Sequence, residues 1–98
     1  MSSPIIEGFL IDDVNEAKFA VHGLSARQVV QVLDNIHIVV PNRKRRRAKY
    51  LVIGRDNGGG CMAIPIEPTH ILHLWRPITA WPCKDREQTL LGKRGRQQ

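Results

Sequence analysis

The chain has 98 residues, 42% of them hydrophobic, which suits one small domain with a modest core and excludes global disorder. No run approaches the ~20 apolar residues of a membrane span, and no basic leader with an apolar stretch opens the chain, so we expect a cytoplasmic protein. Fifteen Lys and Arg against nine Asp and Glu give a net charge of +6. The first 35 residues carry −3 and the remainder +9, an asymmetry that indicates a polyanionic partner, nucleic acid before an acidic protein.

The first 23 residues predict a strand followed by a helix. The apolar run over residues 5–10 is typical of a strand. Asp12-Asp13 then offers an N-cap, with Glu16 three residues after Asp13 in a capping-box arrangement. The helix should run over residues 14–21, and Gly23 suits the left-handed conformation that often ends a helix.

A second helix begins at a clear signal. Ser25 is the expected N-cap, and Gln28 stands at the third helical position of a capping box. This helix should end at Asp34 and form a helical hairpin with the first. Its expected buried stripe consists of Val29, Val30, Val32 and Leu33.

Strands dominate the rest of the chain. We expect them over residues 36–40, 50–54, 61–67 and 70–76, with a short helix that opens at 82–87 and ends near Gly92. Asp56-Asn57-Gly58-Gly59-Gly60 is the strongest turn signal, so the strands beside it should pair as a hairpin. Pro65 lacks an N–H, which predicts an edge strand, a bulge or an early stop.

The order β-α-α-β-β-β-β-α predicts an α+β fold with a mainly antiparallel sheet and its helices packed on one face. We expect a single domain over residues 1–92 and a basic, flexible tail over 93–98.

The sequence lacks the residues that several kinds of catalytic and binding site require. The three serines lie in the terminus or at a helix cap, and no G-K-[ST] follows the glycines at 58–60 to make a phosphate loop. Cys61 and Cys83 are isolated, and we expect both to be reduced. His70 and His73 would point to opposite faces of a strand, so we predict no metal site and no cofactor.

A run of basic residues is the strongest candidate for nucleic-acid binding. Residues 43–49 hold six cations in seven positions, which predicts a solvated loop that contacts phosphates with steep salt dependence. A solubilising loop, or a docking site for an acidic protein, remains an alternative. The candidate nucleic-acid-binding residues are Arg43, Lys44, Arg45, Arg46 and Arg47.

Two arginines at predicted strand ends are the candidate catalytic groups. Arg55 and Arg76 lie beside turns, where we expect side chains to converge, and guanidinium groups stabilise charge on a phosphoryl transition state. His22 ends the first helix and is a candidate acid or base, or simply a capping histidine. Trp75 and Trp81 are either core anchors or platforms for base stacking.

The order of short motifs resembles the BrnT toxin family of bacterial type II toxin–antitoxin systems. The resemblance covers about residues 5–90. It passes through F-L-I-D (9–12), N-E-A-K (15–18), H-G-L-S (22–25), the helical stretch 29–33, Y-L-V-I-G-R (50–55) and H-L-W-R-P-I-T-A (73–80).

This resemblance implies a RelE-like fold, a metal-independent ribonuclease that stops translation, and a cognate antitoxin that neutralises it in a hetero-oligomer. It places Arg55 and Arg76 at positions implicated in toxicity. Val21 stands where the family usually has a functional lysine, and Lys49 is the nearest substitute. The leading hypothesis is therefore RNA cleavage by Arg55 and Arg76 with Lys49 or His22 in proton transfer, and the alternative is a non-catalytic module that binds nucleic acid or an antitoxin.

Overall fold

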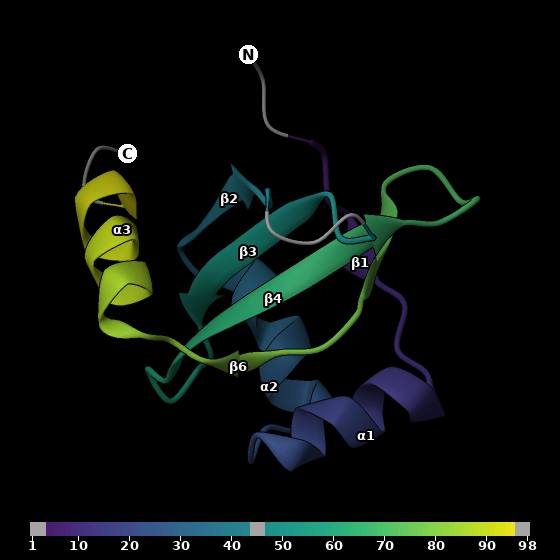
Figure 1. Ribbon diagram of the computed structural model, residues 1–98, viewed down its shortest axis with the longest axis horizontal. Coiled ribbons are helices and arrows are strands. Elements are labelled where there is room, and N and C mark those ends of the chain that lie inside the picture. The colour runs from purple at the N-terminus through teal and green to yellow at the C-terminus, as the bar shows by residue number, and fades with distance from the viewer. Residues whose placement is uncertain (1–3, 44–46, 96–98) are drawn as a thin grey trace.

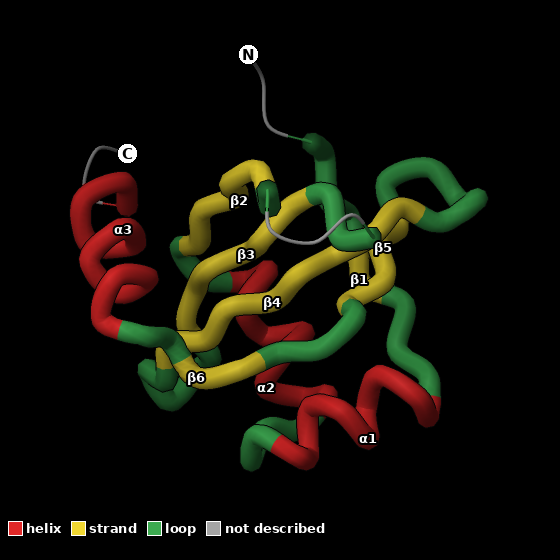
Figure 2. The backbone as a smooth tube through the Cα atoms, in the orientation of Figure 1, coloured by secondary structure: helices red, strands yellow, loops and turns green. Residues whose placement is uncertain are grey.

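Within residues 4–43 and 47–95, which the computed structural model describes, the chain forms three α-helices and a mixed six-stranded sheet (Figures 1 and 2). The α+β class is confirmed. None of the helices in this part of the chain is long and apolar enough to cross a membrane. In chain order the elements are β1 (Gly8–Phe9), α1 (Asp13–Val21), α2 (Ala26–Gln31), a 3₁₀ turn (Val32–Asp34), β2 (His37–Pro41), β3 (Tyr50–Arg55), β4 (Cys61–Pro68), β5 (Leu74–Pro77), β6 (Trp81–Pro82) and α3 (Asp85–Gly95).

The sheet has the strand order β1-β5-β4-β3-β2 and is mainly antiparallel, as predicted. The hairpin of β3 and β4 forms around the glycine-rich turn, with Arg55 opposite Cys61. Only β1 is parallel to its neighbour β5, among the strand pairs in the described ranges. β6 pairs with the start of β4, whereas β5 pairs with its end.

Helices cover both faces of the sheet, so the prediction that all helices pack on one face is wrong. α1 and α2 lie against one face, where Phe19 and Val29 pack with Ile64 (the α1–α2 face). α3 covers one end of the opposite face, where Leu91 packs with Ile53 (the α3 face; Figure 1). The reason is visible in the central strands, because they are apolar at successive positions and therefore present hydrophobic side chains to both faces.

The helical pair begins and ends close to its predicted signals. Ser25 and Gln28 form the expected capping box, and Gly23 has φ +74° after α1. The first cap lies one residue earlier than predicted, since Asp12 accepts a hydrogen bond from the Asn15 N–H at 2.8 Å. Asn15 is fully buried and also donates to the Pro77 carbonyl at 3.0 Å, which ties α1 to β5.

The second helix buries fewer of its apolar residues than expected. Val29 and Val32 are buried, Leu33 is half-buried, and Val30 remains 38% exposed. The chain switches to 3₁₀ geometry at Val32, which rotates the following residues away from the regular α-helical stripe.

Strand lengths differ from the prediction at both sides of the sheet. The first strand contains only Gly8 and Phe9, which pair with Leu74 and Trp75 of β5. β5 begins at Leu74 instead of residue 70, since His73 has φ +66°, a left-handed conformation that interrupts an extended chain. His70 and His73 therefore lie in a turn and not on a strand.

The segment after β5 contains a strand and a covalent link that were not predicted from the sequence. Trp81–Pro82 pairs with β4 and brings Cys83 beside Cys61, and the two cysteines form a disulfide. The expectation of reduced cysteines is therefore wrong for this structure. α3 continues to Gly95 and not only to Gly92, so Lys93 is helical; residues 96–98 of the predicted tail lie outside the described part.

Pro65 lies inside a continuous strand, contrary to the expected edge, bulge or stop. Its carbonyl accepts the Ile78 N–H at 2.9 Å, so its backbone faces the gap between β5 and β6 and not β3. The missing N–H of Pro65 thus removes no hydrogen bond from the pairing of β3 with β4.

The β3–β4 turn is fixed by one buried carboxylate. Asp56 accepts the Gly60 N–H at 2.8 Å and the Gln28 side-chain amide at 3.0 Å. The hydrogen bond from Gly60, followed by that from Gln28, holds the pKa of Asp56 below its usual range. Gly54 lies in β3, two residues before Asp56. A Cβ at this position would lie 2.6 Å from the Val32 side chain.

Candidate functional site

The two candidate catalytic arginines lie at opposite ends of β4. Arg55 pairs with Cys61, the first residue of that strand, and Arg76 pairs with Glu67, near its last. Six residues of extended chain separate these two positions, which corresponds to about 20 Å. The expected convergence of Arg55 and Arg76 in one site is therefore wrong.

Arg76 is held by two carboxylates. Its Nε and Nη2 atoms donate to both oxygens of Asp12 at 2.8 and 3.2 Å, and Nη1 donates to Glu67 Oε2 at 3.2 Å. Only 16% of its side chain is exposed. Arg47 binds the same Glu67 with two hydrogen bonds of 3.0 and 3.1 Å. We call the chain of contacts Arg47–Glu67–Arg76–Asp12 the ion-pair network.

The ion-pair network keeps its groups charged. The side-chain hydrogen bond from Arg76 holds the pKa of Asp12 below its usual range, and the one from Arg47 does the same for Glu67. Asp12 in turn raises the pKa of Arg76. Because Asp12 also caps α1, the network joins that helix to β5, β4 and the segment before β3. The ion-pair network gives Arg76 a structural role, and it leaves few of the guanidinium N–H donors of Arg76 for a phosphate.

Arg55 has a different environment. It is exposed at the end of β3 and donates one hydrogen bond from Nη1 to the Gly59 carbonyl at 3.0 Å. It lines an open cavity of about 530 Å³ between the β3–β4 turn and α3. The other lining residues are Asn35, Ile36, Asp56, Asn57, Gly59, Leu91 and Gly92, so none of the other candidate catalytic residues contributes to this cavity.

The candidate proton-transfer residues do not complete a site around Arg55. His22 is exposed at the C-cap of α1, on the helical pair. Lys49 is exposed immediately before β3, at the opposite end of that strand from Arg55. Its N–H donates to the Ile66 carbonyl, which places Lys49 near the end of β4 that holds Arg76. The structure therefore brings Lys49 and Arg76 to one end of the sheet and leaves Arg55 and His22 elsewhere.

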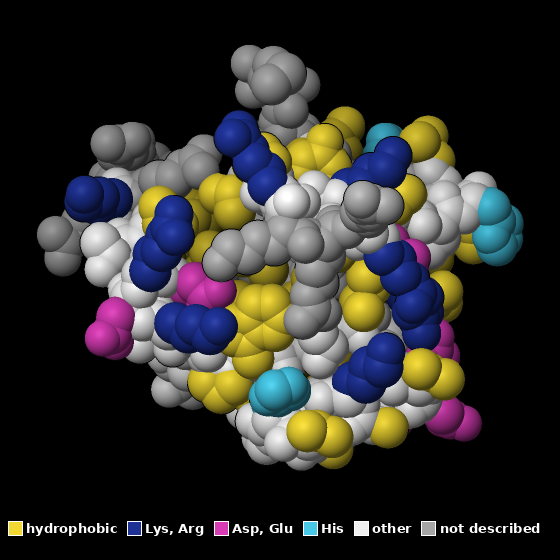
Figure 3. Space-filling view, viewed as in Figure 1, with side chains coloured by type: hydrophobic (Ala, Val, Ile, Leu, Met, Phe, Trp, Pro, Cys, Tyr) yellow, Lys and Arg dark blue, Asp and Glu magenta, His cyan; other side chains and the backbone are white. Residues whose placement is uncertain are grey.

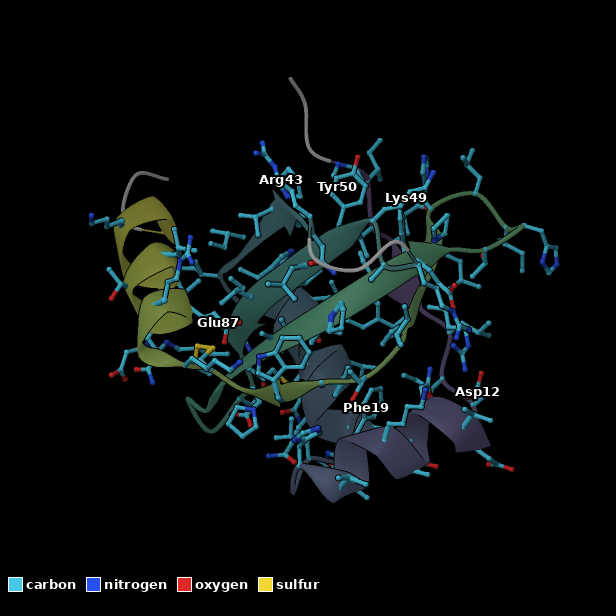
Figure 4. All side chains as sticks on the ribbon, in the orientation of Figure 1. Asp12, Phe19, Arg43, Lys49, Tyr50 and Glu87 are labelled. Carbon is cyan, nitrogen blue, oxygen red and sulfur yellow. A yellow bond between two sulfur atoms is a disulfide. The ribbon has the colours of Figure 1, made fainter. Side chains whose placement is uncertain are left out.

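The predicted basic run contributes to a wider cationic surface. Arg43, Arg47 and Lys49 are exposed, while residues 44–46 of the run lie outside the described part of the chain. Figure 4 labels Arg43 and Lys49 at the same end of the sheet, on the two segments that flank residues 44–46. Lys84, just before α3, and Lys93, near its end, are also exposed. We call Arg43, Arg47, Lys49, Lys84 and Lys93 the basic surface.

The basic surface surrounds an apolar area on the α3 face. Figure 3 views the molecule from this face and shows dark blue Lys and Arg side chains beside α3 and around the far end of the sheet, with yellow apolar side chains between them. In the described part of the chain, Arg43, Lys49, Lys84 and Lys93 form no ion pair. The contributions of Lys84 and Lys93 were missed from sequence, although the surplus of 13 basic over four acidic residues after residue 35 was a signal for them.

Among the described residues, no three His, Cys, Asp or Glu side chains are grouped in a way that could hold a metal ion.

A scan against protein-family models and a search of curated proteins find no match to this chain. The BrnT-like order of motifs remains a prediction from sequence.

Proposed function

We propose that this protein binds RNA through its basic surface without requiring a catalytic step. The observation that carries the proposal is a group of exposed cations on the α3 face that form no ion pair among the described residues: Arg43, Lys49, Lys84 and Lys93. Figure 3 shows Lys and Arg side chains around this face of the sheet, with apolar side chains between them. Such an arrangement attracts a polyanion and releases its counterions on binding.

The geometry favours binding over cleavage. The residues expected to form a catalytic group lie at separate places, and Arg76 is already occupied by Asp12 and Glu67. A reaction centre needs its groups within hydrogen-bond reach of one reacting phosphate. A phosphate-binding surface has no such requirement, because each cation contacts a different phosphate along the strand.

The test is equilibrium binding of a fluorescently labelled RNA to three proteins. The double variant Arg43→Ala/Lys49→Ala removes two cations from the basic surface and should weaken binding at least about tenfold. The matched control Lys18→Ala/Arg27→Ala removes the same charge from exposed positions on α1 and α2 and should bind nearly as the wild type does. Equal losses in both variants, or no binding by the wild type, would refute the proposal.

A ribonuclease toxin with a RelE-like layout is the second candidate function. Two features support it: an N-terminal strand and helical pair precede the antiparallel strands, and Arg55 stands exposed at the end of β3 beside a cavity. On this proposal the partner is a cognate antitoxin in the cytoplasm, an acidic protein that would cover the basic surface in a hetero-oligomer. The candidate predicts loss of full-length RNA during incubation with the pure protein, and growth arrest on expression.

Two variants separate these candidates. Arg55→Ala and Lys49→Ala change exposed residues, so both should fold. If the protein is a ribonuclease, at least one of them should lose RNA cleavage. If it is a binding module, the RNA stays intact with the wild type, and only Lys49→Ala weakens binding.

A further inference from the structure

The Cys61–Cys83 disulfide lies where α3 joins the sheet. Cys61 is the first residue of β4, and Cys83 comes directly after β6, two residues before α3 begins at Asp85. The Cys83 N–H also donates to the Cys61 carbonyl at 2.9 Å. Both cysteines are only half-buried, and partly exposed disulfides are the ones that thiol reductants open most readily. The bond is therefore an accessible covalent tie at the entry to the last helix.

The contacts that dock α3 on the sheet are sparse. Of residues 85–93, whose burial the structure describes, only Leu91 is buried. Leu90 lies at the margin of the same apolar cluster, and Glu87 accepts a hydrogen bond from the Trp81 indole at 3.2 Å. A free helix of this length, 11 residues, is marginal in water, so α3 depends on its contacts with the sheet. The disulfide keeps α3 close to the sheet and thereby favours these contacts.

Two of the four cations that carry the proposed RNA binding move with this helix. Lys84 lies between the disulfide and α3, and Lys93 is on α3 itself. Arg43 follows β2 and Lys49 precedes β3, so both belong to the sheet. The docking of α3 therefore decides whether the two lysines are held on the same face as Arg43 and Lys49.

From these positions we infer that the disulfide is a redox switch of the basic surface. Closed, it holds α3 on the sheet; opened by a dithiol reductant, it releases α3 and weakens RNA binding. A thiolate of the reductant attacks one sulfur and the S–S bond breaks; the second thiol of the reductant then displaces the mixed disulfide. Both cysteines gain one electron and one proton, and the dithiol becomes a disulfide. The effect on RNA rests on the proposed function, whereas the release of α3 does not.

Amide hydrogen exchange of the oxidised and the dithiothreitol-reduced wild type tests the release of α3. Reduction should speed exchange in residues 85–93 at least about tenfold and leave α1 and α2 unchanged, and reoxidation should reverse the effect. The variant Cys61→Ser/Cys83→Ser is the control. Its residues 85–93 should exchange fast both with and without the reductant.

Equilibrium binding of a labelled RNA to the same two forms tests the coupling. Reduction should weaken binding about threefold or more, because mobile lysines must be ordered when the RNA binds. Lys84→Ala/Lys93→Ala should weaken the oxidised protein to a similar extent and remove most of the response to reductant. The control Lys18→Ala/Arg27→Ala should respond to reductant as the wild type does.

The outcomes separate the two claims. Equal exchange of residues 85–93 in the oxidised and reduced protein, or an equal increase throughout the sheet, would overturn the switch. Two free thiols that persist after treatment with glutathione disulfide would overturn it as well. If α3 responds but RNA binds both forms equally, the coupling to the basic surface is wrong and RNA binding stands. If neither form binds RNA, the proposed function fails and the redox-controlled docking of α3 is retained.

Discussion

Replacing Arg76 by Met distinguishes a structural arginine from a catalytic one. Met retains much of the aliphatic length but leaves Asp12 and Glu67 without the guanidinium, which makes three hydrogen bonds of 2.8 to 3.2 Å from a side chain that is 16% exposed. A hydrogen bond to a charged group contributes about 1.5–3 kcal/mol, and solvent around the network reduces the sum. We therefore expect the Arg76→Met variant to lose about 2–3 kcal/mol of unfolding free energy, which lowers Tm by roughly 10–20 °C in a domain of this size.

Arg55→Met is the matched control for this prediction. Arg55 is exposed and donates one hydrogen bond to Gly59, so its loss should change the free energy of unfolding by no more than about 0.5 kcal/mol. Thermal and urea unfolding of both variants, followed by circular dichroism at neutral pH, gives the comparison. Equal stabilities for Arg76→Met and Arg55→Met would refute the structural role assigned to the ion-pair network.

Three further predictions concern the fold. Gly54→Ala should lower the free energy of unfolding by about 1–3 kcal/mol, because the new Cβ would meet packed side chains. Gly92→Ala is the control: its Cβ would point into open space on α3, and it should raise the free energy of unfolding by about 0.5–1 kcal/mol. Urea titrations in which Gly54→Ala is as stable as Gly92→Ala would contradict this packing. Breaking the disulfide by Cys61→Ser should cost about 3 kcal/mol, given its 22-residue separation, and a melt unchanged by reductant would show that the bond is absent in solution. Folding lowers the pKa values of Asp12 and Glu67, so their stabilisation is complete above about pH 5 and is lost as the pH falls through the folded pKa values; a stability that stays constant down to about pH 3 contradicts this.

Local signals in the sequence predicted the local structure well. Ser25 and Gln28 form a capping box because all its partners lie within four residues, and Gly23 adopts a left-handed conformation that its missing side chain permits. The run from Asp56 to Gly60 encodes the β3–β4 hairpin in the same way. The N-cap of α1 lies one residue earlier than predicted. Asp12 and Asp13 are both suitable N-cap residues, and the tertiary hydrogen bonds from Arg76 to Asp12 and from Asn15 to the Pro77 carbonyl favour Asp12.

Non-local contacts explain what the sequence could not predict. The ion pair of Arg76 with Asp12 joins residues 64 positions apart, so no local spacing reveals that this arginine is occupied. Cys83 meets Cys61 only because the two-residue strand β6 returns to β4. The packing of α3 on the second face could have been predicted from the sequence, since both faces of β3 and β4 are apolar.

The salt dependence of RNA binding tests the central claim most directly. Each cation that contacts a single strand contributes about 0.7 to the slope of log K against log salt. Measured from about 50 to 200 mM salt, Arg43→Ala/Lys49→Ala should have a slope shallower than wild type by about 1.4, and Lys18→Ala/Arg27→Ala should keep the wild-type slope. Identical slopes for all three proteins would contradict the assignment of RNA binding to the basic surface.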